Sequence, residues 1–598
     1  MSSLAPASSP LPAPVPAAPP SSRDPDGPQP DLLFRDMDRI AEASLARVAG
    51  GLSPTALALA ATDWWLHLAT SPGKQAELTA RAFRKAQRLA AYAAGAMAGG
   101  KPAPCIEPAK GDHRFDHPGW RAFPFDLAEQ SFLLTQEWWR AATRGVPGVS
   151  RHSEDVVSFM ARQWLDMVSP SNNFFLNPKA LERARESNGE SLARGLRNWA
   201  EDAFAGGPVE DGRFRPGHEV AATPGKVIFR NRLIELIQYA PQTQTVVAEP
   251  ILIVPAWIMK YYILDLSPHN SLIRHLVAQG HTVFCISWLN PGEEDADLAL
   301  DDYRVMGVMA ALDAVGAVVP GRKVHAAGYC LGGTLLTMSA AAMARAGDAR
   351  LASITLLAAQ TDFTEPGELA LFIDDSQLRM LEAMMWSRGY LSDDQMAGAF
   401  RMLRANDLVW SRVTGDYMLG ERAATSDLMA WNADSTRMPY RMHAEYLRSF
   451  YLDNALAAGK LVADGRPLAL ANIHVPIFAV GTETDHVAPW TSVYKIERLA
   501  DSEVTFVLTN GGHNAGIVSE PGHKGRRYRI ATKPHGAPIV GAQEWAQTAP
   551  TRQGSWWEAW TAWLAARSAP QRVAPPPMGA AAAGYPPLED APGRYVLG

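Results

Sequence analysis

A cysteine lies between two glycines at the point where an apolar strand is expected to turn directly into a helix. In the stretch HAAGYCLGGTLLTMSAA, Gly328 and Gly332 flank Cys330 with the spacing G-x-C-x-G. This is the spacing of a nucleophile elbow, a tight strand-to-helix turn that presents a reactive side chain and leaves no room for side chains beside it. The alternative is a small core residue, which most free cysteines are. The flanking glycines favour the elbow, and we interpret Cys330 as a nucleophile.

An elbow nucleophile works with an acid and a histidine that follow it in the chain in that order. Asp485 comes directly after an apolar strand in VPIFAVGTETDHVAPW, and His513 lies in a glycine loop after the next strand, in VTFVLTNGGHNAGIV. Taken singly, Asp485 could be a turn residue or a helix N-cap, and His513 a surface histidine. Their positions at strand ends and their order after Cys330 favour a triad of Cys330, His513 and Asp485.

Two other histidines compete for the role of the base. His486 is adjacent to Asp485 in the sequence and would point away from it. His325 lies inside the strand before the elbow, where a core histidine with satisfied hydrogen bonds is the simpler interpretation. We therefore assign the base to His513.

A tetrahedral intermediate at Cys330 would need backbone N–H donors for its oxyanion. One expected donor is the amide of Leu331, directly after the nucleophile. The other is an amide in the loop WIMKYYILDL, which follows the strand PILIVPA. Trp257 and Ile258 are the candidates in that loop, and we select Ile258. The alternative is that the aromatic residues of this loop only pack the core.

Strand and helix patterns alternate from about Lys226 onward. Apolar strands such as PILIVPA, HTVFCISW, ASITLLAAQ and VPIFAVGTETD are separated by helical stretches such as NSLIRHLVAQG and TLLTMSAAAMARA. Strands that are apolar throughout are typical of a parallel sheet covered on both faces, so the pattern predicts an α/β fold of the α/β-hydrolase type with a doubly wound sheet. An insertion rich in aromatic residues and methionines interrupts the alternation at about 366–471, and we expect it to form a cap.

The other segments differ from this domain in composition. Residues 1–30 are rich in proline, alanine and serine and are expected to be a disordered tail. Residues 31–215 show helical periodicity without a convincing strand, which predicts a helical N-terminal domain. We place the catalytic domain, including its cap, at residues 216–568. Residues 569–598 form a C-terminal tail, much of which is proline-rich like the first segment.

Composition narrows the classes of function. The chain of 598 residues is long enough for two domains, and its net charge of −6 comes from 56 basic and 62 acidic residues without a basic block, so we expect no nucleic-acid partner. Its three cysteines, Cys105, Cys285 and Cys330, form no CxxC pair, which fits a reducing compartment. No apolar run reaches the roughly 18–20 residues of a transmembrane helix, and no signal peptide is recognisable. We expect a cytoplasmic protein without a transmembrane segment.

Several longer segments carry a resemblance to one family. From about Glu129 to its C-terminus the chain resembles the class I polyhydroxyalkanoate synthases, in the segments SPSNNFFLNP (169–178), VPAWIMKYYILDLSPHNSL (254–272), GYCLGG (328–333), DLMAWNAD (427–434), TDHVAPW (484–490) and GGHNAGIV (511–518). The resemblance implies that Cys330, Asp485 and His513 take the family's nucleophile, acid and base positions.

The same resemblance implies the substrate and the partners. The substrate would be a (3R)-3-hydroxyacyl-CoA, with 3-hydroxybutyryl-CoA as the expected unit, and the other ligand would be the growing polyester chain. No cofactor is expected, since the CoA thioester is itself the substrate. The resemblance also implies a homodimer, granule-coat proteins as partners, and a location at the surface of polyester granules in the cytoplasm.

A cysteine suits this chemistry better than a serine. Acyl transfer from a CoA thioester to Cys330 exchanges one thioester for another, so the acyl group stays activated for attack by the next hydroxyl. An acyl-serine would be an oxoester no more reactive than the polymer itself. A helix N-terminus and a neighbouring His513 would also favour the thiolate form of the nucleophile.

Two other functions are compatible with parts of the sequence. A cysteine-type hydrolase that cleaves a thioester or a lactone would use the same elbow and triad, since a fold does not fix a function. A large cap that keeps water from the acyl-enzyme favours the transferase over this hydrolase. A non-catalytic granule-associated scaffold would use the helical domain and the apolar cap, but it would have no need of Cys330, His513 and Asp485.

Overall fold

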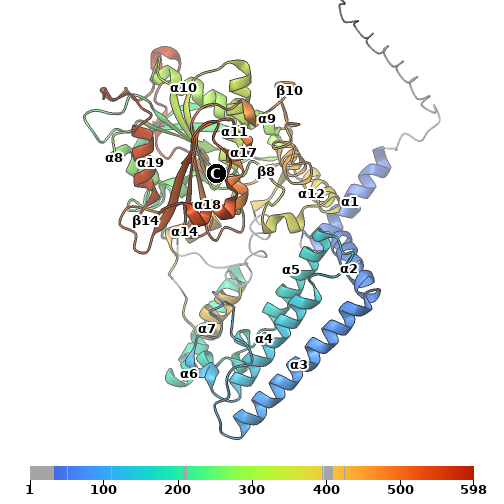
Figure 1. Cartoon of the computed structure of the whole chain (residues 1–598). Coiled ribbons are helices and arrows are strands. Elements are labelled where there is room, and N and C mark those ends of the chain that lie inside the picture. Colours follow the sequence, from blue (N-terminus) through green and yellow to red (C-terminus); the bar gives the residue numbers. More distant parts are fainter. Residues whose placement is uncertain are drawn as a thin grey trace, which may run out of the picture.

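The computed structural model of the chain describes residues 32–598 with the exception of residues 50, 110, 206–211, 394, 396–408 and 423. The segment that we expect to be a disordered tail, residues 1–30, lies outside the described residues. Figure 1 shows a group of long helices from the N-terminal part of the chain and an α/β body formed by the rest.

One large sheet forms the centre of the α/β body. Its strand order is β14-β13-β12-β11-β6-β5-β3-β4-β2-β1-β15, and the central strands from β12 to β4 all run parallel. These central strands are buried almost throughout, as their apolar sequences predict. Their bounds are β3 (Ile251–Val254), β4 (Val283–Trp288), β5 (Val324–Tyr329), β6 (Leu351–Leu357), β11 (Ile477–Thr482) and β12 (Val504–Thr509).

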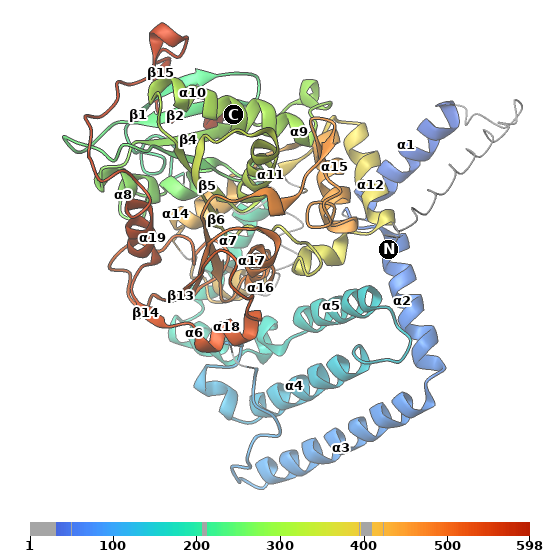
Figure 2. The ribbon, with the colours of Figure 1, turned by 45° about the horizontal axis from the view of Figure 1, so that its top comes forward.

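Helices cover both faces of this sheet. In Figure 2, α11 (Leu331–Ala346) lies on one side of the strands, and α8 (Leu272–Ala278) and α19 (Trp556–Ala565) lie on the other. The prediction of a doubly wound α/β fold is therefore confirmed. The other helices of this part are α9 (Leu300–Asp302), a π-helical turn (Tyr303–Met309), α10 (Ala310–Val318), α16 (Trp490–Tyr494), α17 (Ile496–Leu499) and α18 (Ala542–Thr548).

Antiparallel strands extend the sheet at both edges. Beyond β12 lie β13 (Arg527–Lys533) and β14 (Thr551–Gln553), and beyond β4 lie β2 (Ile234–Tyr239) and β1 (Gly225–Arg230). The outermost strand next to β1 is β15 (Glu589–Asp590), which comes from the C-terminal segment. The parallel strands are thus flanked on both sides, and no parallel strand is an exposed edge.

The C-terminal segment is built into the sheet edge, although its proline-rich composition suggests a loose tail. The buried carboxylate of Glu235 in β2 accepts the backbone N–H groups of Arg594 and Tyr595, at 3.0 Å each. Val596 is also buried. Composition does not reveal this arrangement, because the groups that hold the segment are buried polar side chains far away in the sequence.

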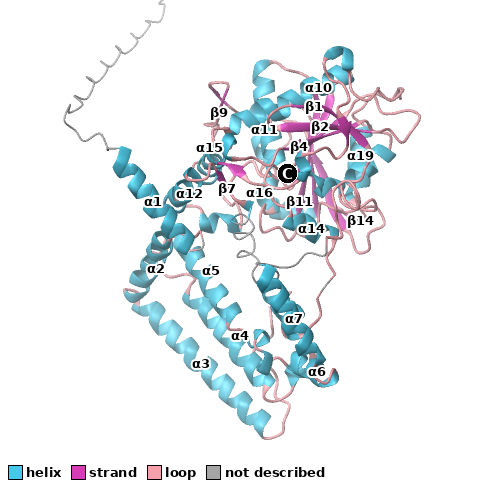
Figure 3. Cartoon of the chain, turned by 180° about the vertical axis from the view of Figure 1, so that it is seen from behind, coloured by secondary structure: helices cyan, strands magenta, loops and turns pink. Residues whose placement is uncertain are grey.

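The described residues of the N-terminal part form helices and no strand, as the periodicity predicts. Some of these helices begin at a polar side chain that caps them: Asn177 Oδ1, for example, accepts the N–H groups of Lys179 and Ala180 at 3.0 and 3.2 Å. Figure 3 shows these helices apart from the strands of the sheet. They are α1 (Leu32–Val48), α2 (Pro54–Ala69), α3 (Pro72–Met97), α4 (Phe125–Ala142), α5 (Arg151–Met167), α6 (Pro178–Glu186) and α7 (Glu190–Ala205).

The predicted cap at 366–471 is the insertion between β6 and β11. Its described residues form helices, one short hairpin of β9 and β10, a two-stranded pair of β7 with β8, and loops. Its described elements are α12 (Asp375–Trp386), β7 (Tyr390–Leu391), a π-helical turn (Val413–Met418), α14 (Asp427–Ala433), β8 (Met438–Pro439), α15 (Tyr440–Tyr446), a π-helical turn (Leu447–Leu452), β9 (Val462–Ala463) and β10 (Arg466–Pro467).

The N-terminal helices contact this cap at several places, and two of these contacts involve the buried side chains of Gln377 and Asp202. At α12, Gln377 accepts the backbone N–H of Ser53 at 2.7 Å and donates to the carbonyl oxygen of Gly51 at 2.7 Å. At α7, the carboxylate of Asp202 accepts the hydroxyl of Tyr417 at 2.8 Å, and its other oxygen accepts a guanidinium N–H of Arg422 at 2.8 Å. We therefore expect these contacts to make the N-terminal helices and the cap move together.

We predict that Gly195→Ala loosens the contact between α7 and the cap. A Cβ at Gly195 would lie 1.9 Å from the carbonyl oxygen of Tyr417, so the backbones must separate, at a cost of about 1–3 kcal/mol. Amide hydrogen exchange of residues 412–422 should become faster, and the thermal midpoint should fall.

A matched control is Gly316→Ala in α10, where a Cβ meets nothing within 4 Å. Alanine in place of this helical glycine should stabilise the protein by up to about 1 kcal/mol. Equal behaviour of the Gly195 and Gly316 variants would contradict the close contact at α7.

Candidate active site

Cys330 occupies the turn between β5 and α11 in a strained backbone conformation. Its φ of 51° and ψ of −124° lie where residues other than glycine are rarely found, and its N–H donates to the carbonyl oxygen of Leu357 at 2.8 Å. Such a conformation costs on the order of 1–3 kcal/mol and persists only where the surroundings hold it, which is often at functional sites. The strand-turn-helix geometry expected from the G-x-C-x-G spacing is present.

The glycines around Cys330 are required by close packing. A Cβ at Gly328 would lie 2.3 Å from the Cα of Gly333, and a Cβ at Gly333 would lie 2.4 Å from the Cβ of Ala359. At Gly332 a Cβ would lie 2.1 Å from the carbonyl oxygen of Val254, at the end of β3. The first turn of α11 is therefore pressed against the strands on either side of β5, which fixes the position of the cysteine.

Asp485 follows β11 and is held by four hydrogen bonds. Its Oδ1 accepts the N–H groups of Val487 and Ala488 at 2.9 and 2.8 Å, and its Oδ2 accepts the hydroxyl of Thr482 at 3.0 Å. Oδ2 also lies 2.8 Å from Nδ1 of His513. Burial disfavours the charged carboxylate, but the His513 charge and these hydrogen bonds outweigh it and lower the pKa of Asp485. The carboxylate is ionised and fixed in orientation.

His513 follows β12 and joins Asp485 to Cys330. Its Nδ1 is bonded to Asp485, and Cys330 lies close enough to act on the pKa of the imidazole through its charge and as a hydrogen-bond partner. Burial opposes the imidazolium, but the charges of Asp485 and Cys330 and the hydrogen bonds to both outweigh it, so the pKa of His513 lies well above the ordinary range. The three residues, far apart in sequence, form one connected group.

Two tyrosines of the cap lie near the Cys330 thiol, and the sequence alone does not identify them. The hydroxyls of Tyr446, from α15, and Tyr451, from the following π-helical turn, are 3.2 Å apart. Burial raises the pKa of both phenols, and the negative charge of Cys330 adds to this effect. Tyr446 also packs edge-on against Trp257, with ring centres 5.9 Å apart. Their only signal in the sequence is the aromatic-rich composition of the insertion.

The predicted oxyanion donors come from two segments that meet at the elbow. Leu331 is the first residue of α11, and the N–H groups of a first helical turn have no partner within the helix. The loop that carries Ile258 follows β3, which touches the elbow at Gly332. The carbonyl oxygens of Trp257 and Ile258 accept the hydroxyl and the N–H of Thr436, at 2.7 and 3.3 Å. No described contact joins the Ile258 amide to Cys330, so Ile258 stays a prediction.

The competing histidines and cysteines lie outside this group. Both ring nitrogens of His325 are bonded to serine hydroxyls, at 2.7 and 3.0 Å, and burial lowers the pKa of His325 to about 4, as expected for a core histidine. His486 is exposed. Burial raises the pKa of the thiol of Cys285 well above the ordinary range, and burial also raises that of Cys105. Neither of these thiols is poised to react.

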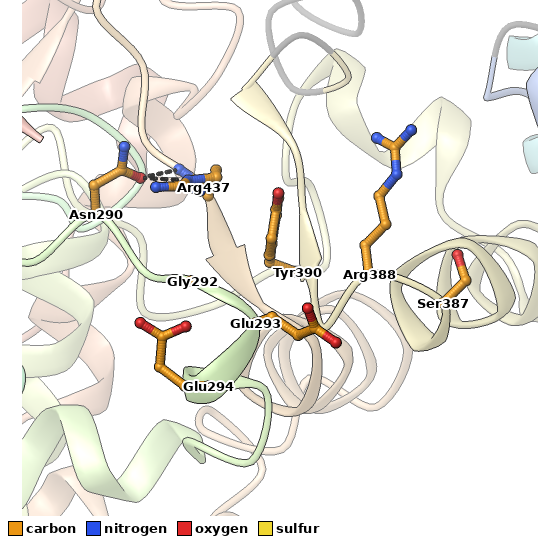
Figure 4. A pocket seen from close by; sticks show the side chains of 8 residues that line it. All are labelled: Asn290, Gly292, Glu293, Glu294, Ser387, Arg388, Tyr390 and Arg437. Atoms are coloured by element: carbon orange, nitrogen blue, oxygen red, sulfur yellow. Dashed lines mark hydrogen bonds between the residues drawn. The ribbon is translucent and has the colours of Figure 1, made fainter.

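A polar cavity of about 490 Å³ lies between the cap and the loop after β4, away from Cys330 (Figure 4). Arg437 donates through its backbone N–H to Asn290 Oδ1 at 2.9 Å, and its guanidinium lies over the ring of Tyr390 at 5.0 Å. Both acidic and basic side chains line the cavity, so its charge does not favour an anion or a cation. Its lining consists of Asn290, Gly292, Glu293, Glu294, Ser387, Arg388, Tyr390 and Arg437.

Two further properties concern the described part of the chain as a whole. No group of three or more His, Cys, Asp and Glu side chains among the described residues could hold a metal ion. None of the helices that the structure describes is long and apolar enough to cross a membrane.

A thiol close to an imidazole that is bonded to a carboxylate is an arrangement suited to nucleophilic acyl transfer.

The chain is similar to known proteins over most of its length. Residues 33–74 match the family model described as poly-beta-hydroxybutyrate polymerase N terminal, residues 111–276 match poly-beta-hydroxybutyrate polymerase (PhaC) N-terminus, and residues 249–520 match alpha/beta hydrolase fold. The poly(3-hydroxyalkanoate) polymerase of Methylorubrum extorquens is 43% identical, over 84% of this chain and 83% of that protein. Proteins named poly(3-hydroxyalkanoate) polymerase subunit PhaC are 39% identical in Rhizobium meliloti, over 81% and 80%, and 38% identical in Cupriavidus necator, over 81% and 83% of the two chains.

We predict that the pKa of His513 depends on both of its neighbours. Asp485→Asn should lower it more than Cys330→Ala, because the charge of Asp485 is the larger of the two effects that raise it. A histidine NMR titration, with His513→Gln to assign the signal, measures both shifts. An unchanged His513 titration in Asp485→Asn would contradict the geometry.

Proposed function

This chain belongs to the poly(3-hydroxyalkanoate) polymerase family, and we propose that it polymerises (3R)-3-hydroxyacyl-CoA thioesters into polyester with release of CoA. The sequence identity of 43% over 84% of the chain supports this assignment. The observation that carries it is the connected group of Cys330, His513 and Asp485 at a strained strand-to-helix turn beneath a cap. For the acyl unit we propose short-chain units such as 3-hydroxybutyryl.

In the acylation step, Cys330 acts as the nucleophile. Its thiolate attacks the thioester carbonyl of the substrate, and the oxyanion that forms is stabilised by the Leu331 amide and, as second donor, the Ile258 amide. The intermediate collapses to a Cys330 thioester and expels the CoA thiolate, which takes a proton from the His513 imidazolium. No cofactor is needed for this step, because the CoA thioester is already activated.

In the elongation step, a 3-hydroxyl group attacks the Cys330 thioester. Its proton goes to His513, since Nδ1 of this histidine is bound to Asp485 and its other ring nitrogen is free to face the sulfur. Asp485 acts by orienting His513 and by stabilising the imidazolium, because both of its oxygens already accept hydrogen bonds. The hydroxyl oxygen forms the new ester bond, and the Cys330 thiolate leaves.

The cap favours polymerisation over hydrolysis. Cys330 is only 9% exposed beneath it, so an acyl group on the sulfur is shielded from water while the next hydroxyl is brought in. A hydrolase would instead need a path for water to the thioester. A scaffold without catalysis would have no use for the strained turn or for the charged group at His513.

The function is tested with purified protein and (3R)-3-hydroxybutyryl-CoA, by measuring released CoA and sedimentable polyester. Cys330→Ala should abolish both, whereas Cys105→Ala and Cys285→Ala should keep most of the activity, because these thiols lie outside the connected group. Free hydroxy acid in place of polyester would indicate a hydrolase. Absence of CoA release from any hydroxyacyl-CoA would indicate a scaffold, and an equal loss in a folded Cys285→Ala variant would refute the role of Cys330.

A second prediction separates the two steps. In Asp485→Asn we expect a burst of CoA release of about one equivalent per site, since a thiol ionises readily, while elongation falls by roughly 10²–10⁴-fold because an alcohol needs the base. His513→Gln should suppress both phases. Rapid-quench measurement of CoA and of chain length distinguishes them, and equal loss of burst and elongation in Asp485→Asn would contradict this division.

We also propose that the N-terminal helices contact the surface of polyester granules in the cytoplasm. Large apolar side chains are exposed on these helices, among them Leu59, Phe83, Trp164 and Leu196, at 62, 64, 63 and 65%. An exposed apolar surface of this kind favours contact with another apolar surface. Association of two copies into a homodimer and contacts with granule-coat proteins stay predictions from the family.

Granule contact is tested by co-sedimentation of the protein with washed polyester particles. Trp164→Ser and Phe83→Ser together should weaken binding several-fold, because each removes apolar area from the proposed contact. The control is Leu588→Ser, a side chain 47% exposed in the C-terminal segment. Equal binding of the double variant and the control would argue against contact through the N-terminal helices.

A further inference from the structure

One side chain connects the strand of Cys330, the loop of His513 and the cap. Asn514, directly after His513, accepts the hydroxyl of Tyr329 through its Oδ1 at 2.6 Å. Its Nδ2 donates to Oδ1 of Asn432 in α14 of the cap at 3.1 Å. Tyr329 is the residue directly before Cys330. The amide of Asn514 is therefore bonded on one side to the neighbour of the nucleophile and on the other side to the cap.

The hydrogen bond from Tyr329 to Asn514 lies beside the ring of His513. The Tyr329 side chain is buried, and its ring lies 5.6 Å from the ring of His513. A buried hydroxyl without an acceptor destabilises the fold, so this proton needs a partner. Because Asn514 accepts the single hydroxyl proton of Tyr329, the residue after His513 is joined to the residue before Cys330.

Helix α14 of the cap, which carries Asn432, is itself held in place by hydrogen bonds. In α14, the indole N–H of Trp431 donates to the carbonyl oxygen of Lys260 at 2.7 Å, and directly after the helix Asp434 accepts the hydroxyl of Tyr262 at 2.8 Å. Lys260 and Tyr262 belong to the segment after β3 that also carries the predicted oxyanion donor. When α14 is seated on this segment, Asn432 is placed where Asn514 can reach it.

The His513 loop needs such a tether because its own backbone is permissive. His513 follows two glycines, and Gly511 has a φ of 112°, which a residue with a side chain rarely adopts. The bond of Nδ1 to Asp485 holds one edge of the imidazole, but it does not fix the distance of the other ring nitrogen to the sulfur. The neighbouring residue Asn514 anchors the loop on two sides.

We propose that Asn514 is a positioning residue that holds His513 against Cys330 and, through Asn432, does so fully only when the cap is seated. An asparagine is suited to this task because it accepts from Tyr329 and donates to Asn432 at once, whereas a carboxylate can only accept and an aliphatic residue can do neither. The proposal rests on the proposed function, since it concerns the base of the acylation and elongation steps.

The test is single-turnover CoA release from (3R)-3-hydroxybutyryl-CoA at saturating substrate, followed across pH. Asn514→Ala should slow acylation by roughly 10–100-fold, as expected for a misplaced catalytic group, with a thermal midpoint close to that of the parent. Its high-pH limb should move to lower pH, because His513 loses contact with the Cys330 charge that raises the pKa of the imidazole. Asp485 and Tyr329, which also face His513, are unchanged in this variant.

Four further variants and one control separate a positioning role from general damage to the fold. Tyr329→Phe should slow acylation, and the double variant Tyr329→Phe with Asn514→Ala should be no slower than Asn514→Ala alone, because both remove one bond. Asn432→Ala should give a smaller loss with the same direction of pH shift. Asn432→Asp keeps an acceptor for the Nδ2 of Asn514, so its acylation rate should be close to that of the parent and above that of Asn432→Ala. Asn472→Ala, in the short helix Leu470–Asn472 away from the site, is the control and should match the parent.

The outcomes distinguish this proposal from the function on which it rests. If Cys330→Ala still releases CoA, the proposed function fails. If Cys330→Ala is inactive while a folded Asn514→Ala keeps the parental rate and pH profile, only the positioning role fails. Multiplying effects of Tyr329→Phe and Asn514→Ala would also refute it, and so would an Asn432→Asp variant as slow as Asn432→Ala. Should Asn514→Ala not fold, the exposed pair Asn432→Ala and Asn432→Asp decides.

Discussion

The strained backbone at Cys330 is the constraint on which the rest of the site depends. A residue with a Cβ is held at a φ of 51° between a parallel strand and a helix, by a hydrogen bond to Leu357 and by glycines with no room for a side chain. The buried parallel strands on either side supply the rigidity that this requires. Once the turn is fixed, the loops after β11 and β12 need only reach the same edge of the sheet to bring Asp485 and His513 to the sulfur.

The cap adds a second requirement, which is exclusion of water from a reactive thioester. Its inner side contributes the tyrosine pair near Cys330 and the asparagine that meets the His513 loop, and its outer side is held by the N-terminal helices. The helices that expose apolar side chains are thus attached to the element that covers the thiol. A contact made by the exposed apolar side chains of these helices would therefore act on the same connected part of the molecule that covers Cys330.

Local patterns predicted much of this arrangement and failed where partners are distant. The elbow, the parallel strands and the place of the cap follow from glycine spacing and apolar runs, and the positions of Asp485 and His513 follow from strand ends. The hydrogen bond from Tyr329 to Asn514 joins the end of β5 to the loop after β12, and no periodicity predicts it. The C-terminal segment pairs with β1 because Glu235 is buried and needs donors, which composition does not reveal. The choice between Trp257 and Ile258 as second oxyanion donor does not follow from local patterns either, since it depends on how one loop approaches another.

The most direct test of the central claim is to trap the acyl-enzyme and locate the acyl group. The protein is mixed with isotopically labelled (3R)-3-hydroxybutyryl-CoA, quenched in acid within the first turnover, digested, and analysed by mass spectrometry. The account predicts a labelled hydroxybutyryl thioester on the peptide that contains Cys330, which hydroxylamine removes. A label on another residue, or turnover to polyester with no label on the Cys330 peptide, would contradict it.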